Sequence, residues 1–308
     1  MPHGACAPAA VRARRTVDPP CAPAAVRARR TVDPPPRDGT RWVMTTSAPT
    51  PRALSFDRAA ASYAAARPGY PPALFDAIEE LAGRPLDGAR AVDVGAGTGI
   101  ATLLLHTRGA RVTAVEPGPG MAAELHRSLP SVPVVRGDGN RLPLATASVD
   151  LLTYAQSWHW TDPALSLAEA ARVLRPGGAL ALWWNVADHS VAWIAEQDER
   201  LRRHFGTGDS AHGSAVTPGG GAGSRLPEGA FVRRRLPWGR TVPVETHLTN
   251  LASHSAFLVR GAGEEERTRE FLDEERRHLA AVFPDGTVEE RYVVDLGVVV
   301  VDGPDTAG

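Results

Sequence analysis

The chain has 308 residues, of which 43% are hydrophobic and 22% are charged, as expected for a folded globular protein. Its formal net charge of −1 provides no overall attraction to nucleic acid or to an anionic membrane, and its two cysteines cannot build a disulfide-held scaffold. All 34 basic residues are arginines, which excludes mechanisms that need a lysine, such as a Schiff base or a Walker A phosphate loop. No apolar run approaches the length of a membrane span, and we expect a cytoplasmic protein.

The N-terminal part of the chain contains a tandem duplication. Residues 6–20 and 21–35 are identical, and both are rich in proline, arginine and alanine. Neither copy has an apolar stripe, so no buried surface would offset the entropy lost on ordering it. The sequence therefore predicts a disordered tail over residues 1–52, followed by one domain over residues 53–308. Residues 1–43 carry eight Arg and three Asp, a charge of +5, yet the rest of the chain is acidic and we expect no nucleic-acid partner.

From residue 89 onwards, segments typical of strands alternate with segments typical of helices. Short apolar runs predict buried strands at 89–94, 111–115, 132–135, 148–155, 179–184 and 291–301. Between them, helical spacing predicts helices near 100–109, 119–129 and 162–175. This alternation predicts an α/β fold with a doubly wound, mostly parallel sheet, in which ligands bind at the carboxyl ends of the strands.

Two helix faces are predicted from spacing and charge. The helix that begins after Asp162 is expected to bury Leu167, Ala168, Ala171 and Leu174. The charged run at 274–277 is expected to form a solvated face. Residues 206–229 contain eight glycines and predict a long flexible loop.

A glycine-rich turn follows the first predicted strand, with the sequence Asp93-Val94-Gly95-Ala96-Gly97-Thr98-Gly99. Its glycines allow a sharp turn and a close approach of a ligand to the backbone. A dinucleotide fingerprint would need a third glycine at Ile100, so nicotinamide binding is disfavoured. An acid at position 93 suits a ligand that carries an ammonium group.

Two further acids follow the next two strands. Glu116 ends the second strand, where a carboxylate can accept hydrogen bonds from both hydroxyls of a ribose. Asp138 follows the third strand and can accept from an adenine amine. Together with Asp93 they occupy three successive strand ends.

At this point the chain resembles the class I S-adenosylmethionine-dependent methyltransferases of the small-molecule type, strongly over residues 56–184 and more loosely to residue 301. The motifs that carry the resemblance are Arg67-Pro68-Gly69-Tyr70-Pro71, the turn at 92–99, Glu116-Pro117, Gly137-Asp138, Gln156-Ser157-Trp158-His159-Trp160 and Leu174-Arg175-Pro176-Gly177-Gly178. The pattern around Gln156 and His159 is similar to that of trans-aconitate-type carboxyl methyltransferases.

The resemblance implies a fold, a cofactor and a set of site residues. The fold would be a Rossmann-like, seven-stranded sheet whose last strand is antiparallel. S-adenosylmethionine would be held at its methionine part by Asp93 and the backbone of residues 95–99, and at its ribose by Glu116 beside Pro117. Its adenine would lie against Asp138, the backbone of Gly139 or Asn140, and Met121. Gln156 would line the methionine end.

The acceptor side is predicted less sharply. His159 is the best candidate for a general base, with packing between aromatic residues as the alternative. Trp158 and Trp160 would form an apolar wall for the acceptor or the methionine chain. Tyr63, Arg67 and Tyr70 would close over the methionine carboxylate or an acidic acceptor, and the alternative is an ordinary surface helix.

The sequence thus predicts an enzyme that methylates a small molecule, such as a carboxylate or a phenol, by in-line displacement. It predicts no metal site, because no histidine has metal-ligand spacing. It predicts no membrane partner and leaves the oligomeric state open. Two alternatives remain: an NAD(P)-dependent oxidoreductase, or a regulatory protein that binds S-adenosylmethionine without turnover.

Overall fold

The computed structural model describes residues 66–205, 231–253 and 264–301. The tail predicted over residues 1–52, the candidate Tyr63 and the glycine-rich loop predicted at 206–229 all lie outside these residues. Everything described belongs to one compact unit of the chain.

Within the described residues, seven strands form a single sheet in the order β3-β2-β1-β4-β5-β7-β6. The strands are β1 (Arg90–Val94), β2 (Arg111–Glu116), β3 (Val134–Arg136), β4 (Val149–Ala155), β5 (Leu174–Ala187), β6 (Val232–Pro243) and β7 (Thr287–Val300). The first five pair in parallel, whereas β7 is antiparallel to both of its neighbours. The predicted seven-stranded, mostly parallel sheet with an antiparallel last strand is confirmed, and β7 lies inside the sheet as its apolar run indicates.

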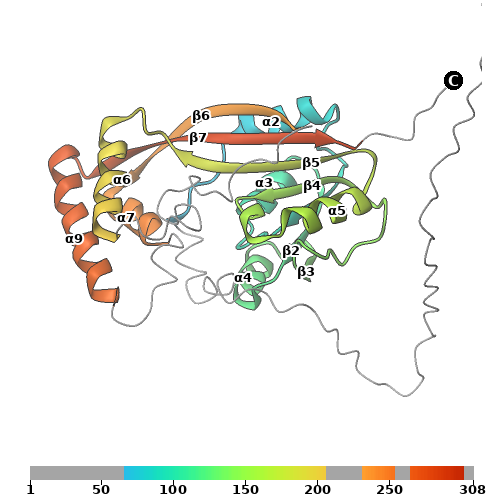
Figure 1. Cartoon of the computed structure of the whole chain (residues 1–308), viewed down its shortest axis with the longest axis horizontal. Helices are drawn as coiled ribbons and strands as arrows, with labels where there is room; N and C mark the ends of the chain where they lie inside the picture. The colour runs from blue at the N-terminus through green and yellow to red at the C-terminus, as the bar shows by residue number, and fades with distance from the viewer. Residues whose placement is uncertain (1–65, 206–230, 254–263, 302–308) are drawn as a thin grey trace, which may run out of the picture. The chain divides into compact units, whose positions relative to one another are not determined.

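Helices cover both faces of the sheet and gather beyond one end of it (Figure 1). They are α2 (Pro72–Ala82), α3 (Ile100–Thr107), α4 (Pro119–Ser128), α5 (Pro163–Val173), α6 (Ala192–Phe205), α7 (Val244–Ala252) and α9 (Glu264–Val282). Residues of α2, α3 and α4 pack in one core, and those of α5 pack in the core on the other face. Helices α6, α7 and α9 lie together past the end of β5, with a small core of their own.

The alternation of side chains along the strands separates the two cores. In β5, Trp183 faces the core of α2 and α3, whereas the next residue, Trp184, faces the core of α5. Both are almost fully buried. Burial of a side chain of this size contributes roughly 3 kcal/mol, so each tryptophan anchors one face of the sheet.

Helix α5 is rotated relative to the predicted face. Ser166, Ala170 and Val173 are its buried residues, whereas Ala168 and Ala171 are exposed. The Asp162 side chain accepts from the backbone N–H groups of residues 164 and 165, which fixes where the first turn begins. The helix also ends earlier than its Pro-Gly-Gly sequence suggests, because Leu174 already belongs to β5.

The sequence predicted that the charged run on α9 forms a solvated face, but one of its residues is buried. Glu275 is fully buried and accepts from Arg200 Nε at 2.5 Å and from Gln197 Nε2 at 3.1 Å. A buried carboxylate persists only when such partners replace its hydration. Glu275 therefore ties α9 to α6. None of the helices in the described ranges is both long and apolar enough to cross a membrane.

Candidate functional site

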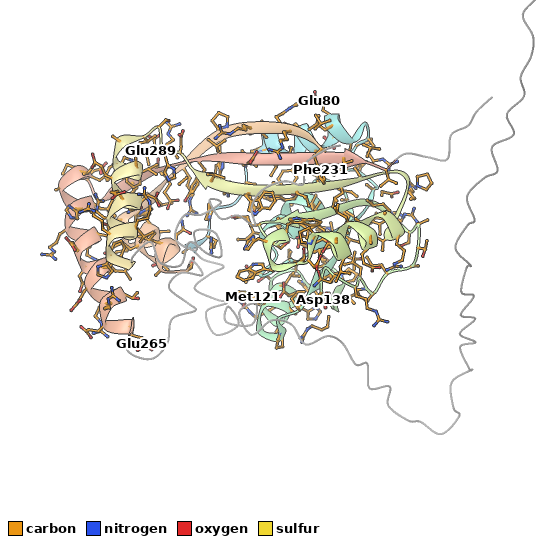
Figure 2. The ribbon with its side chains drawn as sticks, viewed as in Figure 1. Glu80, Met121, Asp138, Phe231, Glu265 and Glu289 are labelled. Carbon is orange, nitrogen blue, oxygen red and sulfur yellow. The ribbon has the colours of Figure 1, made fainter. Side chains whose placement is uncertain are left out.

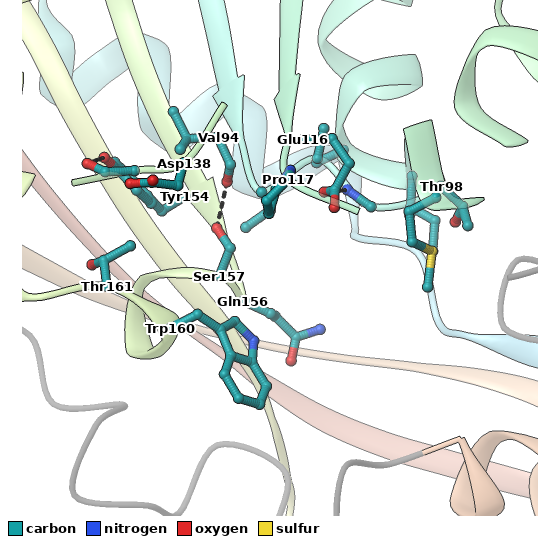
Figure 3. A pocket seen from close by; sticks show the side chains of 18 of the residues that line it. Val94, Thr98, Glu116, Pro117, Asp138, Tyr154, Gln156, Ser157, Trp160 and Thr161 are labelled. Carbon is teal, nitrogen blue, oxygen red and sulfur yellow. Dashed lines mark hydrogen bonds between the residues drawn. The ribbon is translucent and has the colours of Figure 1, made fainter. Parts of the chain in front are cut away.

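A cavity lies at the carboxyl ends of β1, β2 and β4, the sheet edge predicted from the sequence (Figure 3). It is lined by apolar side chains with a few polar groups among them, as ligand pockets commonly are. Figure 3 shows Trp160 and Gln156 on one side of the hollow and Glu116 and Asp138 on the other. Met121 and Asp138, labelled in Figure 2, both line it. Of the predicted site residues, the lining includes Arg67, Gly95, Ala96, Gly97, Thr98, Glu116, Pro117, Met121, Asp138, Gly139, Asn140, Gln156 and Trp160.

The glycine turn forms the floor of this cavity. Gly95 and Gly97 have φ values of 65° and 58°, a region that residues with a side chain rarely adopt. A Cβ atom on Gly95 would lie 2.6 Å from the Cβ of Ser157, whereas a Cβ on Gly97 would meet nothing within 4 Å. Gly95 therefore serves close packing of the turn against the loop after β4. Gly97 serves the backbone turn and leaves the cavity side open.

Glu116 is held rigidly at the end of β2. Its Oε2 accepts from the Gly97 N–H at 2.8 Å, and its Oε1 accepts from the Gly118 N–H at 2.7 Å. The residue is only 5% exposed but lines the cavity. Carboxylate oxygens are hydrogen-bond acceptors, so the group is of the kind that binds ligand hydroxyls. The two loops that follow β1 and β2 thus aim one carboxylate into the cavity.

The loop after β3 presents Asp138 from the next strand end. Its Oδ1 accepts from the Asn140 N–H at 2.8 Å, which closes a local turn. The Gly139 carbonyl accepts from the Tyr154 hydroxyl at 3.2 Å, and a Cβ on Gly139 would lie 2.9 Å from the Tyr154 ring. This close approach fixes the loop against β4 and places Asp138 on the cavity wall.

Thr98 carries a polar atom that the described residues leave unsatisfied. Its Oγ1 is buried and has no hydrogen-bond partner among them, although the residue lines the cavity. Buried hydroxyls are normally paired, so this oxygen indicates a polar ligand at the glycine turn. The nearby thioether of Met121, itself almost fully buried, offers a flat apolar group an adaptable surface.

Asp93 and Gly99 were predicted to contact the ligand, but neither residue lines the cavity. Asp93 is fully buried within β1 and accepts from the hydroxyls of Thr102 at 2.7 Å and Thr153 at 3.1 Å. Burial raises the pKa of Asp93 to about 6, although both hydroxyls act in the opposite direction. Its side chain therefore braces the base of the turn between α3 and β4. Gly99 caps α3 beneath Leu125, whose Cγ would lie 2.9 Å from an added Cβ.

Gln156 follows β4 in a strained conformation. Its φ of 57° is unusual for a residue with a side chain. The backbone N–H donates to the Trp183 carbonyl at 2.9 Å, and Nε2 donates to the Tyr70 hydroxyl at 3.4 Å. Tyr70 in turn packs edge-on against the Trp183 ring, with centroids 5.6 Å apart. These contacts direct the Gln156 amide into the cavity.

The Trp158-His159-Trp160 segment forms a short 3₁₀ turn that separates its three side chains. Trp158 is 1% exposed and packs edge-on against Tyr154, so the structure places it in the core and not, as predicted, in a wall of the cavity. Trp160 lines the cavity. His159 points to the surface and is absent from the lining.

Arg67 lines the cavity from the segment before α2. Its guanidinium donates to the Ser253 carbonyl at 3.1 Å, at the end of α7. Its own carbonyl accepts from Arg240 at 3.2 Å, and Arg240 also donates to the Ala66 carbonyl at 2.6 Å. Arg67 is therefore a cation fixed over the cavity mouth by two distant elements.

Sequence reasoning named Tyr70 together with Arg67, and Tyr70 does line the cavity, but it did not include Tyr154, Ser157 or Thr161, which line the cavity too. Ser157 donates to the Val94 carbonyl and joins the loop after β4 to the end of β1. Its position directly after Gln156 was the available signal. Tyr154 gave no such signal, because it belongs to a strand that is buried almost throughout. Across residues 66–205, 231–253 and 264–301, no three His, Cys, Asp or Glu side chains form a group that could hold a metal ion.

Comparisons with known proteins agree with this architecture. A family model described as a methyltransferase domain matches residues 92–182. The chain is 36% identical over 227 residues to an uncharacterised methyltransferase of Mycobacterium tuberculosis, covering 74% of this chain and 86% of that protein. It is 32% identical to a methyltransferase-like protein of Schizosaccharomyces pombe, covering 71% and 85% of the two chains. A solved structure of a candidate type II methyltransferase from Anaeromyxobacter dehalogenans matches 77% of this chain and 99% of its own, at 26% identity and a TM-score of 0.59.

Proposed function

Since the chain belongs to the class I S-adenosylmethionine-dependent methyltransferases, we propose that it methylates a small-molecule acceptor and that a carboxylate is the favoured acceptor group. The observation that carries the cofactor assignment is Glu116, a rigid carboxylate that shares one cavity with the glycine turn. Family membership also removes the nicotinamide oxidoreductase alternative.

The residues that line the cavity fit S-adenosylmethionine group by group. Glu116 offers a carboxylate acceptor for the ribose hydroxyls, and Asp138 offers one for the adenine amine. The orphaned hydroxyl of Thr98 and the open side of Gly97 suit the methionine part. Met121 suits the face of the adenine ring. Asp93 supports this site from beneath and is not a ligand in the proposal.

When bound, S-adenosylmethionine supplies a methyl group that its sulfonium already activates for in-line displacement. The protein then needs to align the acceptor and exclude water, which can lower a barrier by about 7–11 kcal/mol in favourable cases. Gln156 and Trp160 lie across the cavity from Glu116, and Tyr70 accepts a hydrogen bond from Gln156; these three residues would provide this alignment.

The favoured acceptor follows from the bases that line the cavity. Glu116 and Asp138 are both engaged by backbone N–H groups, and burial raises the pKa of Tyr154 above its usual value. His159 lies outside the lining. A carboxylate is already a nucleophile at neutral pH, whereas a phenol needs a base. Arg67, at the cavity mouth, would pair with an anionic acceptor. The similarity of the sequence to trans-aconitate-type carboxyl methyltransferases remains a prediction, and it also favours a carboxylate acceptor.

Two measurements test the proposal. Calorimetric titration should show binding of S-adenosylmethionine and none of NAD, and Glu116→Gln should weaken the binding while the exposed Glu80→Gln does not. A labelled methyl donor, offered with matched panels of small carboxylates and phenols, should label the carboxylates. Absence of cofactor binding at millimolar concentration would refute the cofactor assignment. Cofactor binding without transfer to any panel member would favour the regulatory alternative, and transfer to phenols alone would refute the carboxylate assignment.

A further inference from the structure

A second cavity lies at the far end of the sheet, between α6, α7 and the first half of β7. It shares no lining residue with the cavity at the glycine turn. Glu289, labelled in Figure 2, marks this end of β7 beside the helices. Because the two cavities are built from different residues, the inference drawn here does not depend on the proposed function.

The second cavity is lined by an unusual number of buried polar side chains. Five of them are at least nine-tenths buried: Gln197, Asp198, His247, Asn250 and Glu290. They come from three separate elements, and removing each from water is unfavourable unless a partner replaces the hydration. A purely structural joint between helices would be more stable with apolar residues at these positions. Their presence around a cavity indicates a polar occupant.

The hydrogen bonds within the network define what that occupant must offer. Glu290 accepts from His247 Nδ1 at 2.7 Å, from Asn250 Nδ2 at 3.3 Å and from Arg240 Nε at 2.5 Å. Asn250 Nδ2 also donates to the Tyr292 hydroxyl at 3.1 Å. The donors of His247 and Asn250 that face Glu290 are therefore already in use.

One acceptor is left over. Asn250 Oδ1 is buried and has no hydrogen-bond partner among the described residues, and Asn250, only 3% exposed, lines the cavity. An unpaired buried carbonyl oxygen costs about 1–3 kcal/mol. A ligand that donates an N–H or O–H group to Asn250 Oδ1 would remove this penalty.

The remaining walls define the rest of the ligand. Trp193, Ile194, Leu201 and Leu251 provide an apolar surface. Two carboxylates, Asp198 and Glu290, also line the cavity and are paired with Arg202 and Arg240. Hydrogen-bond acceptors therefore outnumber cations among the charged groups that line the cavity. The lining also contains one arginine, Arg291, which is paired with Glu289. This arrangement favours a donor, above all a cationic one, over an anion.

We propose that this cavity is a second ligand site, which binds a small amine with an aromatic or branched apolar body. The ammonium group would donate to Asn250 Oδ1 near the Asp198 and Glu290 carboxylates. The body would lie against Trp193 and Leu251.

Three probes of similar size test the donor requirement: phenethylammonium, 2-phenylethanol and phenylacetate. Titration of the whole chain, followed by calorimetry and by tryptophan fluorescence, should give the tightest binding for phenethylammonium. Phenylacetate should bind at least about tenfold more weakly, since it would leave Asn250 Oδ1 unpaired and bring a charge toward two carboxylates. Trp193→Phe should remove the fluorescence change but keep the calorimetric signal.

Two matched variants test the location. Ala187 lines the cavity, so Ala187→Leu should fill it and weaken phenethylammonium binding by at least about tenfold while leaving the polar network intact. Ala192 is exposed at the start of α6 and does not line the cavity, so Ala192→Leu should change binding less than about twofold.

Several outcomes would overturn the proposal. A cavity that holds only water would show no saturable binding of phenethylammonium at millimolar concentration. Equal binding of phenylacetate, or unchanged binding to Ala187→Leu, would show that the probe binds elsewhere or without the donor requirement. Should Ala187→Leu fail to fold, protection of the Trp193 indole from a soluble quencher by phenethylammonium in the unmodified chain decides, with no protection counting against the site.

Discussion

The glycine turn allows a prediction in which two neighbouring glycines act as each other's control. Gly95 and Gly97 share a positive φ, but only Gly95 faces a close neighbour, the Cβ of Ser157 at 2.6 Å from an added Cβ. The substitutions Gly95→Ala and Gly97→Ala therefore carry the same conformational penalty of about 1–2 kcal/mol. Both also gain the same small stabilisation from a stiffer unfolded chain. Their difference isolates the steric contact.

The steric contact has a calculable size. Ser157 cannot rotate its Cβ away, because that atom is fixed to the backbone and its hydroxyl is bonded to the Val94 carbonyl. Overpacking of this kind costs about 1–3 kcal/mol. Gly95→Ala should thus lower the free energy of unfolding by about 2–5 kcal/mol, and Gly97→Ala by about 1–2 kcal/mol.

Urea denaturation of the two single variants, of Ser157→Gly and of the double variant Gly95→Ala/Ser157→Gly measures these values. Removing the Ser157 side chain should restore about 1–3 kcal/mol to Gly95→Ala, a coupling that a double-mutant cycle reports directly. Equal destabilisation by Gly95→Ala and Gly97→Ala, or strict additivity in the cycle, would refute the packing of the turn against the loop after β4.

Four further changes follow from the site and its surroundings. Glu116→Gln places an N–H₂ group against one of two backbone donors, and should weaken S-adenosylmethionine binding by about 1.5–3 kcal/mol in calorimetry. Burial raises the pKa of Asp93 to about 6, so the folded chain keeps a proton that the unfolded chain releases near pH 3.8. The free energy of unfolding should therefore fall as pH rises from about 4 to 6. Asp93→Asn should abolish this pH dependence in denaturation curves. Arg240→Gln removes a partner of the buried Glu290 and should cost about 3–5 kcal/mol of unfolding free energy, a loss that a thermal scan would detect. His159→Ala should leave turnover of a carboxylate acceptor within about tenfold, whereas loss of a general base would cost about 10²–10⁴.

Much of the cofactor side could be predicted because its signals are local. A residue that ends a parallel strand must lie at the ligand edge of the sheet, so Glu116 could be placed from the length of one apolar run. A positive φ requires glycine, so the turn at Gly95 and Gly97 could be predicted from residue type alone.

Other residues were misplaced because their environment is not local. Asp93 was assigned to the turn, but β1 continues through Val94, and the two-residue period of a strand turns the Asp93 side chain toward α3. Trp158 and Trp160 are indistinguishable in sequence. Only the 3₁₀ turn and the Tyr154 ring decide that Trp158 packs inward while Trp160 faces the cavity.

The second cavity gave no sequence signal at all. His247 and Glu290 are 43 residues apart, and Arg200 and Glu275 are 75 residues apart. In the sequence, each of these four residues is indistinguishable from an ordinary charged or polar residue on a helix or strand. Such a network becomes visible only when distant elements meet, because no periodic pattern within one element encodes it.

The buried carboxylates of the two regions respond to pH in opposite directions, which separates them experimentally. Glu290 is buried, which raises its pKa, but His247 and Arg240 outweigh burial and hold the pKa at about 2. The unfolded chain takes up this proton near pH 4.5, so the stability that ionised Glu290 contributes is lost as pH falls from about 4.5 toward 2. Asp93, with its raised pKa, instead stabilises the folded chain as pH falls from about 6 to 4. A stability maximum between these two windows is therefore expected, and Asp93→Asn should flatten only its alkaline side.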